Sequence, residues 1–338
     1  MENILTRINY RRWQWAARTI AYTASLIIIL GAGPAAAAAK CKKTIKACGC
    51  VAKKGHYALA NDLTSSSAGA DCLTIAGAHV TLDMAGHQMT GPGGVATGAG
   101  IHVMSSGGGA FIDGVNQKIT GFGTGILVDA SDVAIAFVSL RSNAQYGLKI
   151  NGGSRNAMYN SDAGDEFIPL SGNGNTGVLI SNGSGNLIDD IFAAHNGKYG
   201  IEISGGSNNA LHDLDGDFNG IYGIWINGSN GNRVTNSTGS SNAQIGLYIG
   251  CAPTGGISSG CTSATGSANV IDIGDYSSNT ETGIAVDSGD LANQIGLNKI
   301  GFGAENGTSD AVDANTNCGT NLWFNDQIGT TPAQACIN

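Results

Sequence analysis

Two pairs of ionisable residues, Asp189-Asp190 and His212-Asp213, stand 23 residues apart in the chain. If they lie side by side, carboxylate repulsion raises the pKa of one partner and creates an acid and base pair. Carboxylates about 5 Å apart suit a retaining glycosidase, and a wider separation suits an inverting one. Alternatively, Asp190, Asp213 and Asp215 offer the oxygen ligands that Ca²⁺ prefers. A solvated acidic face without catalytic function would show the same pattern.

A second set of residues has the types that bind sugars. Glu202, Trp225 and Tyr248 follow one another at intervals of 23, and an earlier repeat places Lys149 in the same position. Each stands between two apolar residues, so its side chain points outward if those neighbours point inward. Exposed aromatic rings beside a carboxylate would stack on a sugar ring and hydrogen-bond its hydroxyls. Packing under the segment inserted after Gly250 is the alternative interpretation.

The spacing of these residues follows a repeat of about 23 residues. A four-residue motif, Gly-apolar-x-apolar, in which x is variable, begins at Gly125, Gly147, Gly177, Gly200, Gly223, Gly246 and Gly283. An Asn stands four residues before most of them, at Asn143, Asn173, Asn196, Asn219, Asn242 and Asn279, and a second column contains Asn156, Asn186, Asn209, Asn232 and Asn269.

Short alternating runs separated by Gly, Ser and Asn indicate strands that are too close together for crossover helices. The chain must therefore coil, with parallel strands of successive coils about 4.8 Å apart. This arrangement predicts that Asp189 lies beside His212 and Asp190 beside Asp213. It also predicts inward ladders of Asn, whose amide can donate to one copy and accept from another.

These repeats resemble the right-handed parallel β-helix proteins, the superfamily that includes pectate lyases and polygalacturonases. The resemblance begins in Val80-Thr-Leu-Asp-Met-Ala-Gly-His-Gln-Met-Thr-Gly91 and Ile119-Thr-Gly-Phe-Gly-Thr-Gly-Ile126, and it covers roughly residues 48 to 338. It implies an all-β, single-stranded solenoid of about ten coils. The fold does not name a reaction. Asp189-Asp190 is similar to the paired aspartates of polygalacturonases, but their Gly-His-Gly and Arg-x-Lys motifs and the Asp-Pro-His-Glu of alginate epimerases are absent.

Four segments are predicted. Residues 1–39 are expected to be a signal peptide, because arginines precede a short apolar run and a tract of small residues. Residues 40–74 would form a Cys-rich N-terminal cap, residues 75–310 the β-helix and residues 311–338 a C-terminal cap. All eight cysteines follow the signal, and an even number in an exported chain predicts disulfides.

The cysteines are placed where a solenoid needs reinforcement. A disulfide between Cys318 and Cys336 is predicted in the C-terminal cap, and Cys251 and Cys261 bracket an inserted segment. The pairing of the first four cysteines stays open: Cys41, Cys48, Cys50 and Cys72. Disulfides at these places would hold the two caps and one loop.

The charge distribution limits the partners. Residues 40–54 contain six lysines and no acidic residue, whereas residues 55–338 contain seven basic and 24 acidic residues. An acidic surface argues against nucleic acid. The sequence thus predicts a secreted or periplasmic monomer associated with carbohydrate, without a membrane partner after signal cleavage and with no cofactor other than Ca²⁺. It would be a polysaccharide hydrolase or lyase, or a glycan-binding or structural protein without catalytic activity.

Overall fold

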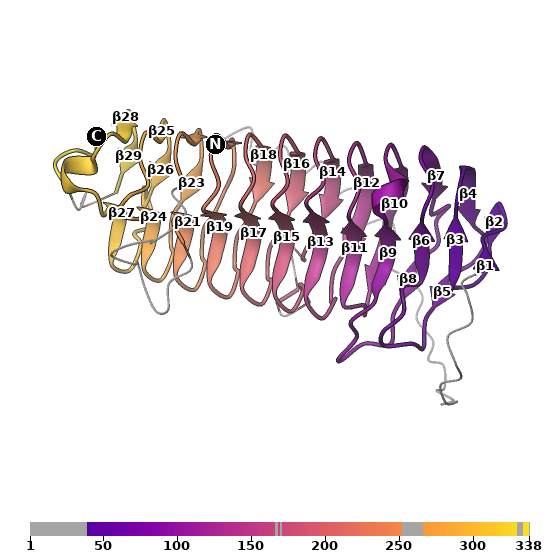
Figure 1. Ribbon diagram of the computed structural model, residues 1–338. Coiled ribbons are helices and arrows are strands. Elements are labelled where there is room, and N and C mark those ends of the chain that lie inside the picture. Colours follow the sequence, from indigo (N-terminus) through magenta and orange to yellow (C-terminus); the bar gives the residue numbers. More distant parts are fainter. Residues whose placement is uncertain (1–38, 166–167, 170, 252–265, 330–333, 338) are drawn as a thin grey trace. The chain divides into compact units, whose positions relative to one another are not determined.

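The computed structural model describes residues 39–165, 168–169, 171–251, 266–329 and 334–337, which belong to one compact unit. Its strands pair in parallel from coil to coil, so the predicted parallel β-helix is confirmed (Figure 1). The predicted signal peptide lies outside the described residues. Within the described ranges, no helix is long and apolar enough to cross a membrane.

Sheet A is one of the two long sheets. It contains, in spatial order, β1 (Ala39–Lys40), β3 (Cys50–Ala52), β6 (Leu73–Ile75), β9 (Ala99–Val103), β11 (Thr124–Val128), β13 (Tyr146–Asn151), β15 (Thr176–Ser181), β17 (Tyr199–Ser204), β19 (Tyr222–Asn227), β21 (Ile245–Ile249), β24 (Thr282–Val286) and β27 (Ser309–Asp313).

Sheet B forms a second face of the coils. Its main path contains β2 (Thr44–Ile45), β4 (Gly55–Leu59), β7 (Val80–Asp83), β10 (Phe111–Thr120), β12 (Ala134–Leu140), β14 (Ala157–Asp162), β16 (Leu187–Phe192), β18 (Ala210–Asp215), β20 (Arg233–Thr235), β22 (Val270–Asp272), β25 (Gln294–Gly296) and β28 (Leu322–Phe324). Alongside it, β5 (Leu63–Thr64) pairs with β8 (Met89–Thr90).

The remaining elements are short. A third sheet contains β23 (Asp275–Tyr276), β26 (Lys299–Ile300) and β29 (Gln327–Ile328), and two single-turn 3₁₀ helices lie at Ser105–Gly107 and Thr316–Cys318. Pairing begins at β1 and continues to β29, so paired strands lie within both segments for which caps were predicted.

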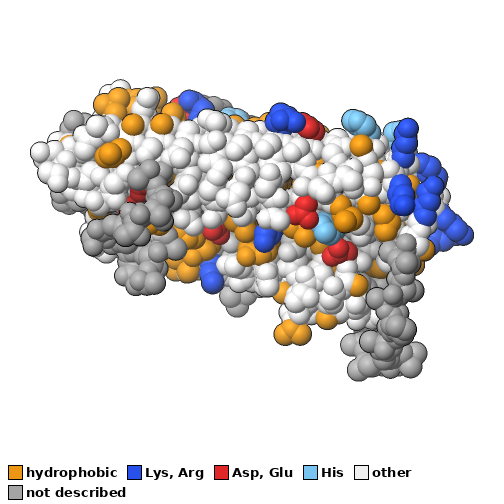
Figure 2. Space-filling model, viewed as in Figure 1, with side chains coloured by type: hydrophobic (Ala, Val, Ile, Leu, Met, Phe, Trp, Pro, Cys, Tyr) orange, Lys and Arg blue, Asp and Glu red, His pale blue; other side chains and the backbone are white. Residues whose placement is uncertain are grey.

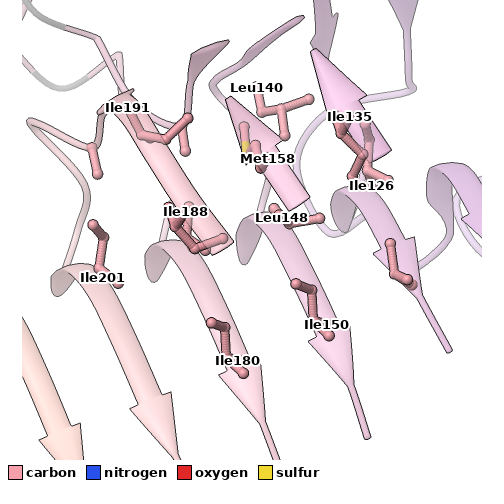
Figure 3. Close-up of a cluster of buried hydrophobic side chains, with 14 of the residues drawn as sticks. Ile126, Ile135, Leu140, Leu148, Ile150, Met158, Ile180, Ile188, Ile191 and Ile201 are labelled. Atoms are coloured by element: carbon pink, nitrogen blue, oxygen red, sulfur yellow. The ribbon is translucent and has the colours of Figure 1, made fainter. Parts of the chain in front are cut away.

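The core consists of apolar columns that run along the stack of coils (Figure 3). Ile126, Leu148 and Val178 occupy paired positions on three successive strands of sheet A, and all three are fully buried. Ile135, Met158 and Ile188 form the matching column on sheet B. Burying one such side chain contributes about 1.5–3 kcal/mol, so the inward half of the repeat stabilises the fold.

Two ladders of buried Asn join the coils, as the sequence predicts. In one of them the backbone N–H and the Nδ2 of Asn209 both donate to Oδ1 of Asn232, at 3.0 and 2.9 Å. Asn209 in turn accepts the two corresponding bonds from Asn186. All of these bonds have the same direction, with each Asn donating toward the C-terminal end.

At that end, carboxylates replace the amides. Asn306, at the end of one ladder, donates its N–H and its Nδ2 to Oδ1 of Asp310. In a separate short column, Asn298 donates the same two groups to Oδ1 of Asp326. In the other ladder, Asn321 donates its Nδ2 to Oδ2 of Asp313 at 2.9 Å. The last rung needs an acceptor and no further donor, which a carboxylate provides.

One corner of the coil uses the left-handed backbone conformation. It contains Asp190 and Asp213, with φ of 56° and 58°, and in later coils Ile273 and Leu297, with φ of 56° and 61°. Asp tolerates this conformation better than a β-branched residue does. The Ile273 side chain is also 54% exposed, so little packing offsets its backbone strain.

Disulfides reinforce both ends of the described coils. The pairing that the sequence left open is Cys41–Cys50 and Cys48–Cys72, and the predicted Cys318–Cys336 bond is present. Cys251 is also disulfide-bonded, whereas Cys261 lies outside the described residues. The described cysteines therefore include no free thiol.

Candidate functional site

The outward column of sheet A has the predicted register. Across β9, β11, β13, β15 and β17 the paired residues are His102, Leu127, Lys149, Leu179 and Glu202. At about 4.8 Å per coil, this column spans about 19 Å. Figure 2 shows a lengthwise band in the lower half of the viewed face, in which a few charged side chains lie among hydrophobic ones. We call the outer face of these five strands the sheet A strip.

The strip begins at His102, whose ring lies between Asp71 and Asp129; we call these three residues the histidine clasp. His102 Nδ1 lies 2.8 Å from Oδ2 of Asp71, and its Nε2 lies 2.8 Å from Oδ2 of Asp129. Asp129 also accepts Nδ2 of Asn151 at 2.9 Å. The hydrogen bond to Asp71, opposed by burial and assisted by Asp129, raises the pKa of His102 to about 9. A protonated ring with both nitrogens engaged is a cationic link between coils and cannot serve as a general base.

Lys149 and Glu202 lie further along the strip. The Lys149 Nζ is 5.3 Å from the centroid of the Tyr146 ring, a cation–π contact. Glu202 is half-buried, and burial raises the pKa of its carboxyl, although Asn227 and the charges of Lys198 and Lys149 oppose this shift. A carboxyl with a raised pKa can donate a hydrogen bond when protonated and accept when ionised.

The predicted exposure of Trp225 and Tyr248 is wrong. Trp225 is 3% exposed and Tyr248 is fully buried, although their register beside Glu202 is as predicted. The Trp225 ring centroid lies 4.8 Å from that of Tyr199, and its Nε1 donates to the Gly250 carbonyl at 2.9 Å.

Other contacts cover the tyrosine. The Tyr248 hydroxyl donates to Oδ2 of Asp287 at 2.6 Å. Outward orientation therefore does not mean exposure here, because neighbouring aromatic rings and polar groups cover both side chains. On the strip, Tyr199 is the partly exposed member of this aromatic cluster.

Asp189 lies beside His212, as predicted, on neighbouring strands of sheet B. Oδ1 of Asp189 is 2.7 Å from Nδ1 of His212, and the two side chains are 40% and 48% exposed. Asp190 and Asp213 follow them at the left-handed corner of β16 and β18, and Asp213 accepts Nδ2 of Asn236 at 3.0 Å. The structure thus brings together the acid and histidine on which the catalytic hypothesis depends.

The predicted calcium ligands are not gathered into a site. Asp213, with its left-handed backbone, lies before the buried Leu214, and Asp215 lies after it. Burial raises the pKa of Asp215, and burial together with the charge of Asp215 raises that of Asp217. Within the described ranges, no group of three His, Cys, Asp or Glu side chains could hold a metal ion.

Comparison with protein families gives a match over slightly more than half of the chain. Residues 124–300 match the right-handed beta helix region. The chain belongs to the right-handed β-helix family. This confirms the resemblance that the repeats indicate, and it gives the coil its handedness. Comparison with curated protein sequences gave no significant match.

Solved structures of other β-helix proteins are similar in fold. The Dettilon tailspike protein (gp208) shares 14% sequence identity with a TM-score of 0.57, over 83% of this chain and 60% of the tailspike chain. The A-module of the Azotobacter vinelandii mannuronan C-5 epimerase AlgE6 shares 12% identity with a TM-score of 0.46, over 84% of this chain and 78% of the module. At these identities the likeness concerns the fold alone.

Sequence reasoning missed the two carboxylates of the clasp. Asp71 lies just before β6 and Asp129 just after β11, outside the Gly-apolar-x-apolar motif in which His102 stands. Only the folded coil brings them to the histidine. A search for acids at the ends of strands that flank a ladder histidine would have found them.

Proposed function

We propose that this chain is an exported β-helix protein that binds a polysaccharide along the sheet A strip. The observation that carries the proposal is the outward column that holds Lys149 and Glu202 two coils apart beside the rings of Tyr146 and Tyr199. Charged hydrogen-bonding groups beside flat rings are the features that a sugar chain needs.

The length of the strip supports a polymer as ligand. Its column runs for about 19 Å at the coil spacing of about 4.8 Å, so an extended oligosaccharide would contact several rungs at once. Glu202 would accept hydrogen bonds from sugar hydroxyls through its carboxylate oxygens. Lys149 would donate to hydroxyl or carboxylate oxygens.

Export is supported by the disulfides. Three bonds join the described cysteines at the two ends of the coils, and such bonds persist in oxidising compartments. We therefore place the protein outside the cytoplasm, as a secreted or periplasmic protein.

Polysaccharide cleavage is the second candidate function, and the Asp189–His212 contact favours it. Because Asp189 accepts a hydrogen bond from Nδ1, the neutral ring of His212 carries its free lone pair on Nε2. That nitrogen could remove a proton from a sugar or from water. Asp190 and Asp213 on the adjacent corner would act as acid or as electrostatic stabiliser in a hydrolase or lyase.

Binding is tested by affinity electrophoresis of the full chain in gels that contain neutral or acidic polysaccharides, with calcium and with EDTA. Glu202→Gln and Lys149→Gln should each weaken retention by about tenfold or more, since a hydrogen bond to a charged group contributes about 1.5–3 kcal/mol. Glu305→Gln is the matched control, because Glu305 is an exposed acid outside the strip. Equal effects of Glu202→Gln and Glu305→Gln would contradict the proposed site.

Cleavage is tested by following reducing ends and the absorbance of unsaturated products with the same panel. Asp189→Asn and His212→Ala should abolish turnover. His87→Ala is the control, because His87 forms a similar surface contact with Asp62 at 3.3 Å. Retention on polysaccharide without turnover would support binding alone and would exclude this second candidate.

A further inference from the structure

The lysine-rich segment of the sequence forms one end of the described coils. Lys40 lies in β1, and the others lie on either side of β2 or between β3 and β4: Lys42, Lys43, Lys46, Lys53 and Lys54. All six side chains are exposed. Figure 2 shows basic side chains gathered at one end of the coils, the end that Figure 1 labels β1 to β4. We call this surface the lysine end.

The lysine end keeps its positive charge unpaired among the residues that the structure describes. Among the residues that the structure describes, none of the six ammonium groups forms an ion pair with a carboxylate. Lys43 is the most constrained of them, since its Nζ donates to the Lys54 carbonyl at 3.1 Å and lies 4.7 Å from the Tyr57 ring centroid. The nearby acids Asp62 and Asp71 each face a histidine, His87 and His102.

The lysine end is also hollowed. An open cavity of about 620 Å³ is lined by the segment 39–50, which includes four of the six lysines. An anionic group entering it would meet several ammonium groups together with backbone of the first coil. The feature is therefore a basic concave surface, in addition to being a run of charge in the sequence.

We propose that the lysine end docks onto a membrane surface that contains anionic phospholipids. Phosphate groups are met by lysine as a point charge, and a headgroup that projects from a plane can enter a hollow at the end of a stack of coils. A soluble polysaccharide chain would instead favour a surface that extends along its length, such as the sheet A strip. Each lysine near an anionic bilayer contributes about 1 kcal/mol.

The distribution of charge determines which part of the protein can approach an anionic membrane surface. Residues 55–338 carry 24 acidic and seven basic side chains, so most of the protein is repelled by an anionic surface. Twenty of these acids stand at or after Asp129, which follows β11, four strands beyond β1 in sheet A, or about 19 Å away at the usual strand spacing; only Asp62, Asp71, Asp83 and Asp113 precede it. This distance is more than twice the Debye length of about 8 Å at physiological ionic strength. Attraction at the lysine end is therefore felt while the repulsion of the acidic coils is screened.

Docking in this orientation leaves the sheet A strip accessible, because the coils stack away from the docked end. The interaction is peripheral and spans no bilayer. It revises the prediction that the protein has no membrane partner after signal cleavage, at this one surface. It is independent of the proposed glycan binding, since the two involve different coils.

The experiment is vesicle co-sedimentation of the full chain, with phosphatidylcholine vesicles and with vesicles that also contain phosphatidylglycerol. The quantity compared is the increase in binding when phosphatidylglycerol is present. Subtracting the binding to phosphatidylcholine vesicles removes any contribution of residues 1–38 that does not depend on lipid charge. Two double variants with the same change in net charge are compared: Lys42→Gln with Lys46→Gln at the lysine end, and Lys118→Gln with Lys299→Gln elsewhere. Circular dichroism melts confirm that both fold.

In the lysine-end variant, the increase in vesicle affinity that phosphatidylglycerol produces should be about 25-fold smaller. This is equivalent to about 2 kcal/mol, at 1.4 kcal/mol per tenfold. The control variant should lose little, and added salt should abolish the difference. Equal losses in both variants would overturn the proposal, because they would reflect net charge alone. Absence of any anionic gain would also overturn it, as would a lysine-dependent affinity for an anionic polysaccharide with none for vesicles.

Discussion

Removing one amide from an Asn ladder should destabilise the coils far more than removing an exposed amide. Asn209→Ala deletes the Nδ2 bonds to the Gly183 carbonyl and to Asn232, at 3.1 and 2.9 Å. It also removes the Oδ1 that accepts the backbone N–H and the Nδ2 of Asn186. Asn186 Nδ2 keeps the Gly153 carbonyl, but its buried N–H loses the side-chain acceptor.

The expected cost follows from the buried groups that lose a partner. The Asn186 N–H and the Gly183 carbonyl each lose a bond to Asn209, and an unsatisfied buried group costs about 1–3 kcal/mol. The unfolding free energy should therefore fall by about 2–6 kcal/mol. Asn151→Ala is the matched control, since exposed Asn151 makes one bond, to Asp129, and its loss should cost about 1 kcal/mol or less.

The assay is urea denaturation followed by circular dichroism, combined with amide hydrogen exchange. A repeat protein can unfold in parts, so exchange of the Asn186 N–H gives the local effect and the denaturation midpoint the global one. Protection at Asn186 should fall in Asn209→Ala and stay unchanged in Asn151→Ala. Equal destabilisation by the two variants would refute the view that the ladder joins the coils.

Three further predictions concern single residues. By NMR titration the pKa of His102 should be about 9, and Asp129→Asn should lower it. The stabilisation that His102 contributes is then full below the usual histidine pKa of 6.5 and is lost as pH rises through about 9. A measured His102 pKa near 6.5 would contradict the proposed contacts with Asp71 and Asp129. Burial raises the pKa of Asp326 from 3.8 to about 6, so the native state holds this proton more tightly, and stability from this group is full below pH 3.8 and lost as pH rises through about 6. Thermal melts across that range should show a smaller pH dependence in Asp326→Asn, and an unchanged dependence would exclude this group as its source. Ile273→Asn should raise the urea midpoint by the equivalent of about 1 kcal/mol, because Asn tolerates the left-handed conformation, and a lower midpoint would contradict the assigned strain.

Much of the fold could be predicted because inward residues repeat with one period. Stacking requires that Asn209 lie beside Asn232 and Ile188 beside Leu211, and the strand pairing has this register. The same register correctly placed Asp189 beside His212. Position along a ladder is thus set by the period, whatever side chain occupies it.

Exposure could not be predicted in the same way. The residues that cover Trp225 and Tyr248 include Tyr199, Tyr222 and Asp287, which the period leaves free to vary. Whether an outward side chain reaches solvent depends on the size and polarity of its neighbours on adjacent coils. The repeat therefore predicts orientation, and only the packed structure gives accessibility.

The direction of the Asn ladders explains a feature of their ends that spacing alone does not reveal. At the N-terminal end, Oδ1 of Asn143 accepts the Phe122 N–H at 3.1 Å, so a backbone donor begins the ladder. At the other end the last Asn still has two donors to satisfy, and backbone carbonyls are already used between coils. A carboxylate meets this need with one oxygen. In the separate short column of Asn298, Asp326 is the corresponding carboxylate, and its second oxygen is buried without a hydrogen-bond partner. Protonation of this oxygen removes a buried charge, and burial raises the pKa of Asp326. In the two long ladders, an Asp that accepts from the last Asn, Asp310 or Asp313, marks where the ladder ends.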